Sequence, residues 1–266
     1  MRLDNSLVLA CFLLATVSPL AADDNELITD RPDQTESTAI VGRGVVQIET
    51  GALLERDESD TLVEESTELA GTLVRWGLSE RFELRFGFAG FLRQDVETPF
   101  GRSHDEGLGD ADLGFKLRLR EGDGTSPALA LIASTSLPVG EDGFTSDRFD
   151  PTLRLSVSHD FESGAGFGWN LGYRRESTPT FFDTEHQDFF FYTASLALPV
   201  GDRFGTFFEL FGDIATGGDG EDAHSFDTGI TFLLTDDVQL DTFAGVGITD
   251  EAPDTFLGVG LSWRLR

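Results

Sequence analysis

Charged side chains recur at every second position in several segments of this sequence. From Asp110 to Arg120, charged residues or Gly alternate with Ala, Leu or Phe. Successive side chains of a β-strand point to opposite faces, so this spacing predicts a strand with one charged face and one apolar face. Charged faces that meet around a closed lumen would line a water-filled pore. The candidate pore-lining residues are Arg75, Glu83, Arg85, Asp110, Asp112, Lys116, Arg118, Arg120, Arg154, Arg174, Glu209, Asp213, Asp227 and Asp241.

The basic and acidic candidates are separated along the chain. Basic residues predominate from Arg75 to Arg174, whereas the candidates from Glu209 to Asp241 are all acidic. In one interpretation, neutralising salt bridges fill the lumen. In the other, a basic wall faces an acidic wall across a water-filled constriction, in the way that charged rings tune other pores. The sequence leaves both open, and they can hold at different depths.

Catalytic and metal-binding patterns are scarce. The sequence has four histidines: His104, His159, His186 and His224. No two of them stand at ligand spacing on one expected strand, and no Gly-x-Ser-x-Gly elbow is present. The neighbours Ser158–Asp160 would face alternate sides of a strand, which rules out a triad there. Residues 217–222 match one unit of a calcium-binding repeat that needs several stacked copies. We expect no catalytic residue, no metal and no cofactor, and a barrel enzyme is the remotest interpretation.

The first residues predict export. Residues 7–20 form an apolar run too short to span a bilayer, and Ala21-Ala22 then lead into Asp23-Asp24. This pattern predicts a signal peptide over residues 1–22. The one cysteine, Cys11, lies in this run, so the exported chain would have no disulfide and no thiolate chemistry. The formal net charge of −29 argues against a nucleic-acid partner, which needs a basic surface.

Twelve segments with a period of two lie between residues 45 and 265. In Phe82–Arg93, for example, Phe86 and Leu92 fall on one face, and Glu83 falls on the other together with Arg93. Short connections alternate with longer ones, as in outer-membrane barrels with short periplasmic turns and longer outside loops. The expected fold is therefore all-β, a transmembrane antiparallel β-barrel of twelve strands over residues 44–266.

Residues 23–43 precede the first expected strand and do not alternate. Pro32 and the crowding of polar residues argue against a strand there. This segment either hangs in the periplasm as a lead segment or folds into the lumen as a plug. The plug candidates are Asp30, Arg31, Asp33 and Glu36. In the plug alternative, the three carboxylates would meet the basic wall.

Several stretches carry a family resemblance. Leu27–Ser37 contains Thr-Asp-Arg-Pro-Asp, and Gly107–Phe115 contains Gly-Asp-Ala-Asp-Leu-Gly. With Gly44–Gly51, Gly77-Leu78 and Arg81–Arg85, they resemble a family of bacterial outer-membrane transporters named for the meta-cleavage pathway of phenol degradation. The resemblance covers essentially the whole exported chain and implies a barrel with a transport-like role. One departure is the end of the chain, where many such barrels have an aromatic residue and this sequence has Arg; it concerns recognition by the barrel-assembly machinery.

We therefore expect a protein of the bacterial outer membrane whose partners are outer-membrane lipid, the barrel-assembly machinery and small-molecule solutes. The expected function is that of a channel or transporter for the passive movement of small molecules, with hydrophobic or aromatic compounds as candidate solutes. The alternative is a closed barrel with a structural or surface-interaction role.

A closed barrel predicts resistance to detergent. All backbone N–H and C=O groups of closed strands are paired, so SDS finds no strand edge at which to begin unfolding. The folded protein should migrate differently on SDS gels before and after boiling. Identical migration, together with a monomer that stays in solution without detergent, would contradict the barrel.

Overall fold

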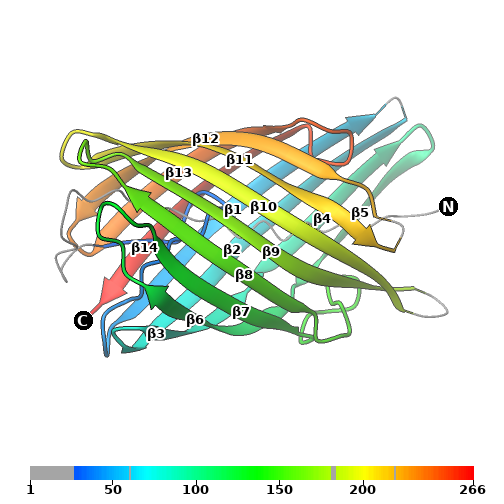
Figure 1. Cartoon of the computed structure of the whole chain (residues 1–266). Coiled ribbons are helices and arrows are strands. Elements are labelled where there is room, and N and C mark those ends of the chain that lie inside the picture. Colours follow the sequence, from blue (N-terminus) through cyan, green and yellow to red (C-terminus); the bar gives the residue numbers. More distant parts are fainter. Residues whose placement is uncertain (1–26, 60, 181–183, 219) are drawn as a thin grey trace.

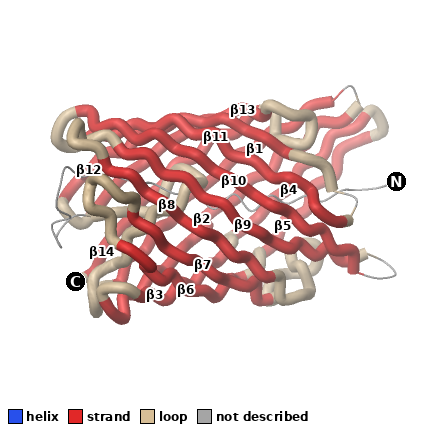
Figure 2. Tube along the Cα trace, in the orientation of Figure 1, coloured by secondary structure: helices blue, strands red, loops and turns tan. Residues whose placement is uncertain are grey.

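The computed structural model describes residues 27–59, 61–180, 184–218 and 220–266. Within these ranges, antiparallel strands close into a barrel, and Figure 2 shows that the connections gather at its two ends. The expected signal peptide, residues 1–22, lies outside the described residues. No described helix is long and apolar enough to cross a membrane.

In the part of the chain that the structure describes, the barrel wall consists of fourteen strands in one sheet. Figure 1 shows their course around the barrel. They are β1 (Val46–Ser59), β2 (Leu62–Ser79), β3 (Phe82–Phe88), β4 (Phe91–Thr98), β5 (Gly101–Leu108), β6 (Ala111–Arg120), β7 (Ala128–Leu137), β8 (Pro151–Asp160), β9 (Gly166–Pro179), β10 (Thr184–Val200), β11 (Phe204–Gly217), β12 (Ala223–Thr235), β13 (Val238–Gly247) and β14 (Thr255–Leu265). Each strand pairs with its neighbours, and β1 closes the barrel by pairing with both β14 and β2. Because β3 with β4 and β5 with β6 are each one interrupted crossing of the wall, the predicted twelve-strand barrel is confirmed.

The interruption between β3 and β4 changes which side chains face the lumen. Gly90 has a φ of +79°, and a Cβ there would lie 2.2 Å from Leu69 O, so the close approach of β2 requires glycine. Beyond this point the alternation reverses: Leu92 is buried, whereas Arg93 is exposed and pairs with Asp95 at 2.6 Å. The prediction of one continuous phase over residues 82–93 is therefore wrong in its last residues.

The interruption between β5 and β6 leaves part of the wall without a strand partner. β5 pairs with β4 alone, because β7 ends at Leu137. The connection 138–150 lies beside this edge, where Glu141 N–H donates to Leu108 O at 2.8 Å. Phe144 of this connection packs against Ala89 and Leu92, next to the other interruption. The connection thus seals a section of the wall with side chains and isolated hydrogen bonds.

Other outer connections continue as strands well beyond the length needed to cross a membrane. β1 and β2 extend to Ser59 and Leu62, and β9 and β10 extend to Pro179 and Thr184. Most of the described residues in the ranges 56–65 and 175–187 belong to these extensions. The predicted contrast between short periplasmic turns and longer outer connections persists as hairpins that project from one end (Figure 2).

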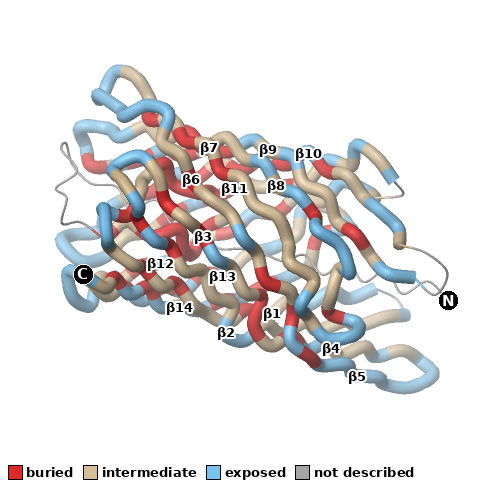
Figure 3. Tube along the Cα trace, turned by 90° about the horizontal axis from the view of Figure 1, so that it is seen from below, coloured by how far each residue is buried: buried red, intermediate tan, exposed pale blue. Residues whose placement is uncertain are grey.

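The two faces of the wall differ as the alternation predicts. Phe86 on β3 and its partner Leu113 on β6 point outward, with 46 % and 50 % of their surface exposed. Glu83 and Lys116, on the opposite phase of the same strands, are fully buried. Figure 3 shows buried positions distributed along the wall strands, whereas the connections at the two ends are mostly exposed. Lipid would cover the exposed apolar face, and the lumen is polar on this side.

Arginine on the outer face should impair assembly. Phe86→Arg or Leu113→Arg would place a charge in lipid, at a cost of about 2–4 kcal/mol at the midplane. We expect a lower urea midpoint for refolding into liposomes and less heat-shifted protein on gels. Phe100→Arg is the matched control, because Phe100 lies at the β4–β5 tip and is 100 % exposed. Equal losses in all three variants would mean that the outer face does not contact lipid.

Candidate functional site in the lumen

Residues 27–43, which we call the lumen segment, lie inside the barrel before the chain enters β1 (Figure 1). Thr29, Asp30 and Thr35 are fully buried there, although residues 29–38 are polar apart from Pro32. Gly44 N–H donates to Gly77 O at 2.7 Å, so the chain turns into the wall at the end with the short turns. Contacts to β1, β2, β3, β6, β8, β9, β10, β11, β13 and β14 surround the segment.

The backbone of the lumen segment has little strand pairing, so its N–H groups need other acceptors. Inward side chains of the wall supply them. Asp30 N–H donates to Glu49 at 2.8 Å, and Gln34 N–H donates to Glu209 at 2.5 Å. Glu36 N–H donates to Asn170 Oδ1 at 2.7 Å, which ties the segment to a third part of the wall. The wall therefore holds the segment by its main chain as well as by its side chains.

Asp30 joins the lumen segment to the basic wall. Its Oδ2 lies 2.5 Å from Arg85 Nη1, 2.8 Å from Lys116 Nζ and 3.2 Å from Arg75 Nη1. All four side chains are buried, and Lys116 is the only lysine of the sequence. Burial alone raises the pKa of Asp30, but the three cations together hold that pKa well below its usual range. The carboxylate therefore stays ionised and compensates three buried cations.

Glu36 extends the same network. Its carboxylate lies 2.7 Å from Arg85 Nη2, 3.8 Å from Lys116 Nζ and 3.7 Å from Arg154 Nη1. Arg154 also donates to Gln34 O at 2.8 Å. The basic wall is thus neutralised by the lumen segment, which matches the salt-bridge interpretation at this depth.

Two acids of the wall complete the network around Arg75. Glu83 Oε1 lies 2.9 Å from Arg75 Nε, and Glu49 Oε1 lies 3.1 Å from Nη1. Glu83 was a predicted pore-lining residue, whereas Glu49 was not. The inward position of Glu49 could have been inferred from strand alternation, because Glu49 lies on the same face of β1 as the buried Gln47. A short polar run on the first strand did not stand out beside the charged runs of later strands.

The acidic wall holds the opposite side of the lumen segment. Arg31 Nη2 lies 3.1 Å from Asp241 Oδ1. The guanidinium packs directly against the backbone of Gly260. A Cβ at that position would lie 2.2 Å from Arg31 Nε, so only glycine leaves enough room. Thr35 Oγ1 donates to Glu209 Oε1 at 2.5 Å. The lumen segment thereby contacts Asp241 through Arg31 and Glu209 through Thr35.

Asp33 does not meet the basic wall, contrary to the expectation for the plug candidates. It lies by Glu209 and Asp227, and burial raises its pKa well above the usual range, with both acids raising it further. Within the described part of the chain, no Lys or Arg pairs with the Asp33 or Asp227 carboxylate. Two buried acids without a cation favour a protonated carboxyl at this position.

The remaining predicted residues lie nearer the ends of the barrel. Arg174 pairs with Asp213 at 2.7 Å, and Asp112 is half-buried on β6. Asp110 instead accepts two backbone N–H groups of the connection 138–150, at 2.8 Å each. Two arginines at the other end bond to backbone carbonyls by the periplasmic turns: Arg118 and Arg120. Asp110 thus positions an outer connection, and these two arginines lie at the rim rather than deep in the basic wall.

Inward phenylalanines were missed by the sequence analysis. The buried ones are Phe189, Phe191, Phe207, Phe243 and Phe256. Phe243 packs over β14, where a Cβ at Gly258 would lie 1.9 Å from its ring, so only glycine leaves room. Arg154 lies over the Phe191 ring, 4.8 Å from its centroid, which joins this aromatic lining to the basic wall. The sequence does contain a sign of this inward position: Phe207 lies two residues from Glu209 and therefore on the same face of β11.

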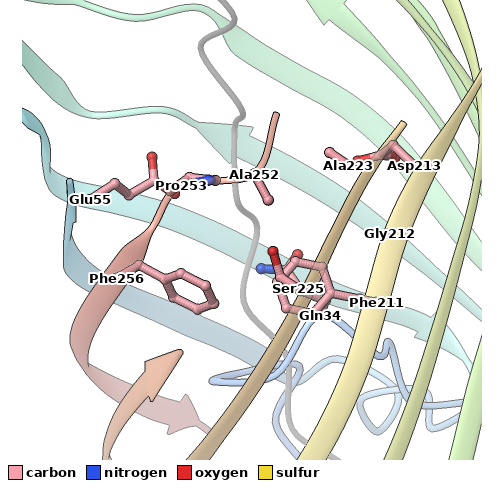
Figure 4. A pocket seen from close by; sticks show the side chains of 10 residues that line it. All are labelled: Gln34, Glu55, Phe211, Gly212, Asp213, Ala223, Ser225, Ala252, Pro253 and Phe256. Carbon is pink, nitrogen blue, oxygen red and sulfur yellow. The ribbon is translucent and has the colours of Figure 1, made fainter. Parts of the chain in front are cut away.

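A cavity of about 30 Å³ lies on the outer side of the lumen segment (Figure 4). Gln34 lines it from below, and Ala252 and Pro253 from the β13–β14 connection. Phe211 and Phe256 form its aromatic wall, with ring centroids 6.0 Å apart at an interplanar angle of 65°. In the ranges that the structure describes, no group of three His, Cys, Asp or Glu residues is placed to hold a metal ion.

Removing the charge of Asp30 should loosen the lumen segment. Asp30→Asn leaves three buried cations short of an anion, and breaking buried ion pairs in this way costs about 3–5 kcal/mol. We expect faster hydrogen–deuterium exchange in residues 27–43 and a lower denaturation midpoint.

Asp33→Asn is the matched control on the same segment. It removes an acid that lies near two other acids, so protection should be unchanged or increased. Asp33 also predicts a pH effect. Its pKa is higher when the lumen segment is bound in the barrel than when the segment is released, so ionisation of Asp33 favours release. The stability of the bound segment should therefore fall as pH rises above about 4. Equal loosening by both substitutions would contradict the assigned roles.

Comparison with known proteins places this geometry in a wider group. The fold is similar to the COG4313 outer membrane channel from Pseudomonas putida F1, with 13 % identity over 86 % of this chain and 98 % of that one and a TM-score of 0.64. It is also similar to the NanC porin (9 % identity, 83 % and 100 % coverage, TM-score 0.53). A third similar structure is the translocator domain of the autotransporter NalP from Neisseria meningitidis (12 %, 84 % and 89 %, 0.56).

At these identities the likeness establishes the fold, which is that of a bacterial outer-membrane β-barrel. No curated protein sequence matches the chain. A family model does match, and it spans residues 29–265, from the lumen segment to the last strand. The chain therefore belongs to the family described as "Putative MetA-pathway of phenol degradation".

Proposed function

We propose that this protein is an outer-membrane channel for the passive movement of small molecules, and that residues 27–43 act as its plug. The observation that carries the proposal is the way the lumen is filled. A closed barrel surrounds a polar segment that is held by hydrogen bonds and ion pairs, with inward acids and bases on both sides. Such contacts can be replaced by water when the segment moves, unlike an apolar core.

The inner phenylalanines support apolar or aromatic solutes. Phe207, Phe243 and Phe256 form one buried cluster with Leu53 and Ala197 on the lumen side of the wall. An apolar strip beside a polar plug offers a solute a surface to follow once the plug moves. Apolar or aromatic solutes are thus supported by the lining of the lumen alone.

The proposal assigns no catalytic step. One serine–histidine contact lies at the outer end of the barrel, where Ser177 Oγ is 2.8 Å from His186 Nδ1. The same hydroxyl donates its proton to Asp150 Oδ1 at 2.5 Å. His186 therefore does not receive that proton, as the base of a nucleophilic serine would.

Conductance in planar bilayers tests the plug. The full chain should give small, infrequent currents, because the lumen segment lies inside the barrel and obstructs the passage of ions. Deleting residues 27–41 should raise the single-channel conductance severalfold. Asp30→Asn should increase the frequency of opening, and it serves as a second variant if the deletion fails to fold.

Three outcomes separate the alternatives. Folded variants that never conduct would favour the closed structural barrel. A deletion variant that conducts no better than the full chain would mean that the lumen segment is not the barrier. Asp33→Asn, which leaves the basic-wall contacts intact, should open no more often than the unmodified chain.

A further inference from the structure

The outer cavity next to the lumen segment has a chemistry that the plug does not use. Glu55 of β1 and its register partner Phe256 of β14 lie on one side of it, and Phe211 lies on the other (Figure 4). The connection that carries Ala252 and Pro253 borders it at the outer end of the barrel. At about 30 Å³, the enclosed space holds one small polar group such as an ammonium, and an apolar attachment would extend out of it along the rings.

Glu55 makes the cavity acidic. On β2, Ser66 is its direct partner, and Glu64 and Glu68 stand two residues to either side on the same face. Burial and then both of these acids oppose a negative charge on Glu55, so a cation bound beside it would stabilise that charge. Among the residues that the structure describes, no Lys or Arg pairs with Glu55.

The neighbouring acids are better compensated. Asp213, which also lines the cavity, pairs with Arg174 at 2.7 Å. The positive charge of Arg31 stabilises the charged form of Glu68. Glu55 is therefore the carboxylate of this cavity that lacks a countercharge.

The floor of the cavity carries an unused hydrogen-bonding group. Gln34 Nε2 is buried and has no partner within the described residues. Its main-chain N–H is committed to Glu209, so the side chain is held in place but its amide is free to bind. Ser225, which is also buried, adds a hydroxyl to the lining. A buried amide without a partner is costly unless a ligand or water satisfies it.

We propose that this cavity binds the ammonium group of a small organic cation, specifically a primary amine that carries an aromatic or short apolar group. The carboxylate of Glu55 pairs with the ammonium, and the two phenylalanine rings contact both the cation and its apolar part. Gln34 Nε2, which is a donor like the ammonium, would bind water rather than the amine. A bare metal ion fits less well, because no group of three acids converges within the described residues. The inference adds a solute class to the proposed channel, but binding itself does not require transport.

Equilibrium binding to the purified full chain in a maltoside detergent tests the proposal. Benzylammonium, benzyl alcohol and benzoate serve as probes of similar size with positive, neutral and negative charge. Calorimetry should show benzylammonium binding at least about tenfold more tightly than benzyl alcohol, with no measurable binding of benzoate. Equal affinity for the amine and the alcohol, or preference for benzoate, would overturn the proposal.

Substitutions locate the site. Glu55→Gln should weaken benzylammonium binding about tenfold or more, and Phe211→Leu should weaken it by a smaller factor. Glu106→Gln removes the same charge from an exposed position on β5 and should leave the affinity unchanged. Equal weakening by Glu55→Gln and Glu106→Gln would show that the amine only screens the acidic rim, which contradicts a defined site.

The result is independent of the channel test. A protein that binds benzylammonium at Glu55 but never conducts would retain the site and lose the proposed function. A conducting protein in which Glu55→Gln does not alter binding would retain the function and lose the site.

Discussion

The structure depends on one constraint: a polar chain inside a closed barrel must satisfy every buried charge and backbone group from the wall around it. Asp30 meets this constraint most fully. One carboxylate compensates Arg85, Lys116 and Arg75, while its own N–H donates to Glu49. Without the lumen segment, these cations would rely on the wall acids alone. The charge pattern of the wall is thus matched to a segment that precedes it in the chain.

The two sides of the lumen hold the segment unequally. On the basic side, Asp30 and Glu36 take part in a connected set of buried ion pairs. On the acidic side, Arg31 pairs with Asp241, but Asp33 faces other acids and pairs with no Lys or Arg in the described part of the chain. Buried pairs are costly to break one partner at a time, whereas unpaired acids favour release. The physical consequence is a segment anchored along the basic wall.

A second constraint is steric. The barrel must accommodate large rings on its inner face without widening, and it does so where the adjacent strand has glycine. The ring of Phe243 covers Gly258, and the ring of Phe256 covers Gly245, each where a Cβ would lie within about 2.1 Å of ring carbon. Arg31 uses Gly51 and Gly260 in the same way. Rings and glycines together form an apolar strip next to the polar network, and the outer cavity lies where the two meet.

The sequence by itself determined the barrel, its number of wall crossings and the side of each strand on which the charges lie, because strand alternation depends only on neighbouring residues. Most members of the basic and acidic walls, among them Arg75, Lys116 and Asp241, could be found in this way. The alternation does not predict the effect of backbone irregularities: the left-handed Gly90 reverses which side chains face inward, so that Leu92 is buried. It also does not predict that Asp110 binds the backbone of an outer connection. Only the tertiary structure decided which acid meets which base. Asp30 and Lys116 are far apart in sequence, and Asp33 is only three residues from Asp30, yet Asp30 reaches the basic wall and Asp33 the acidic one. The path of an irregular segment through the lumen sets these pairings, and it has no period that the sequence could display.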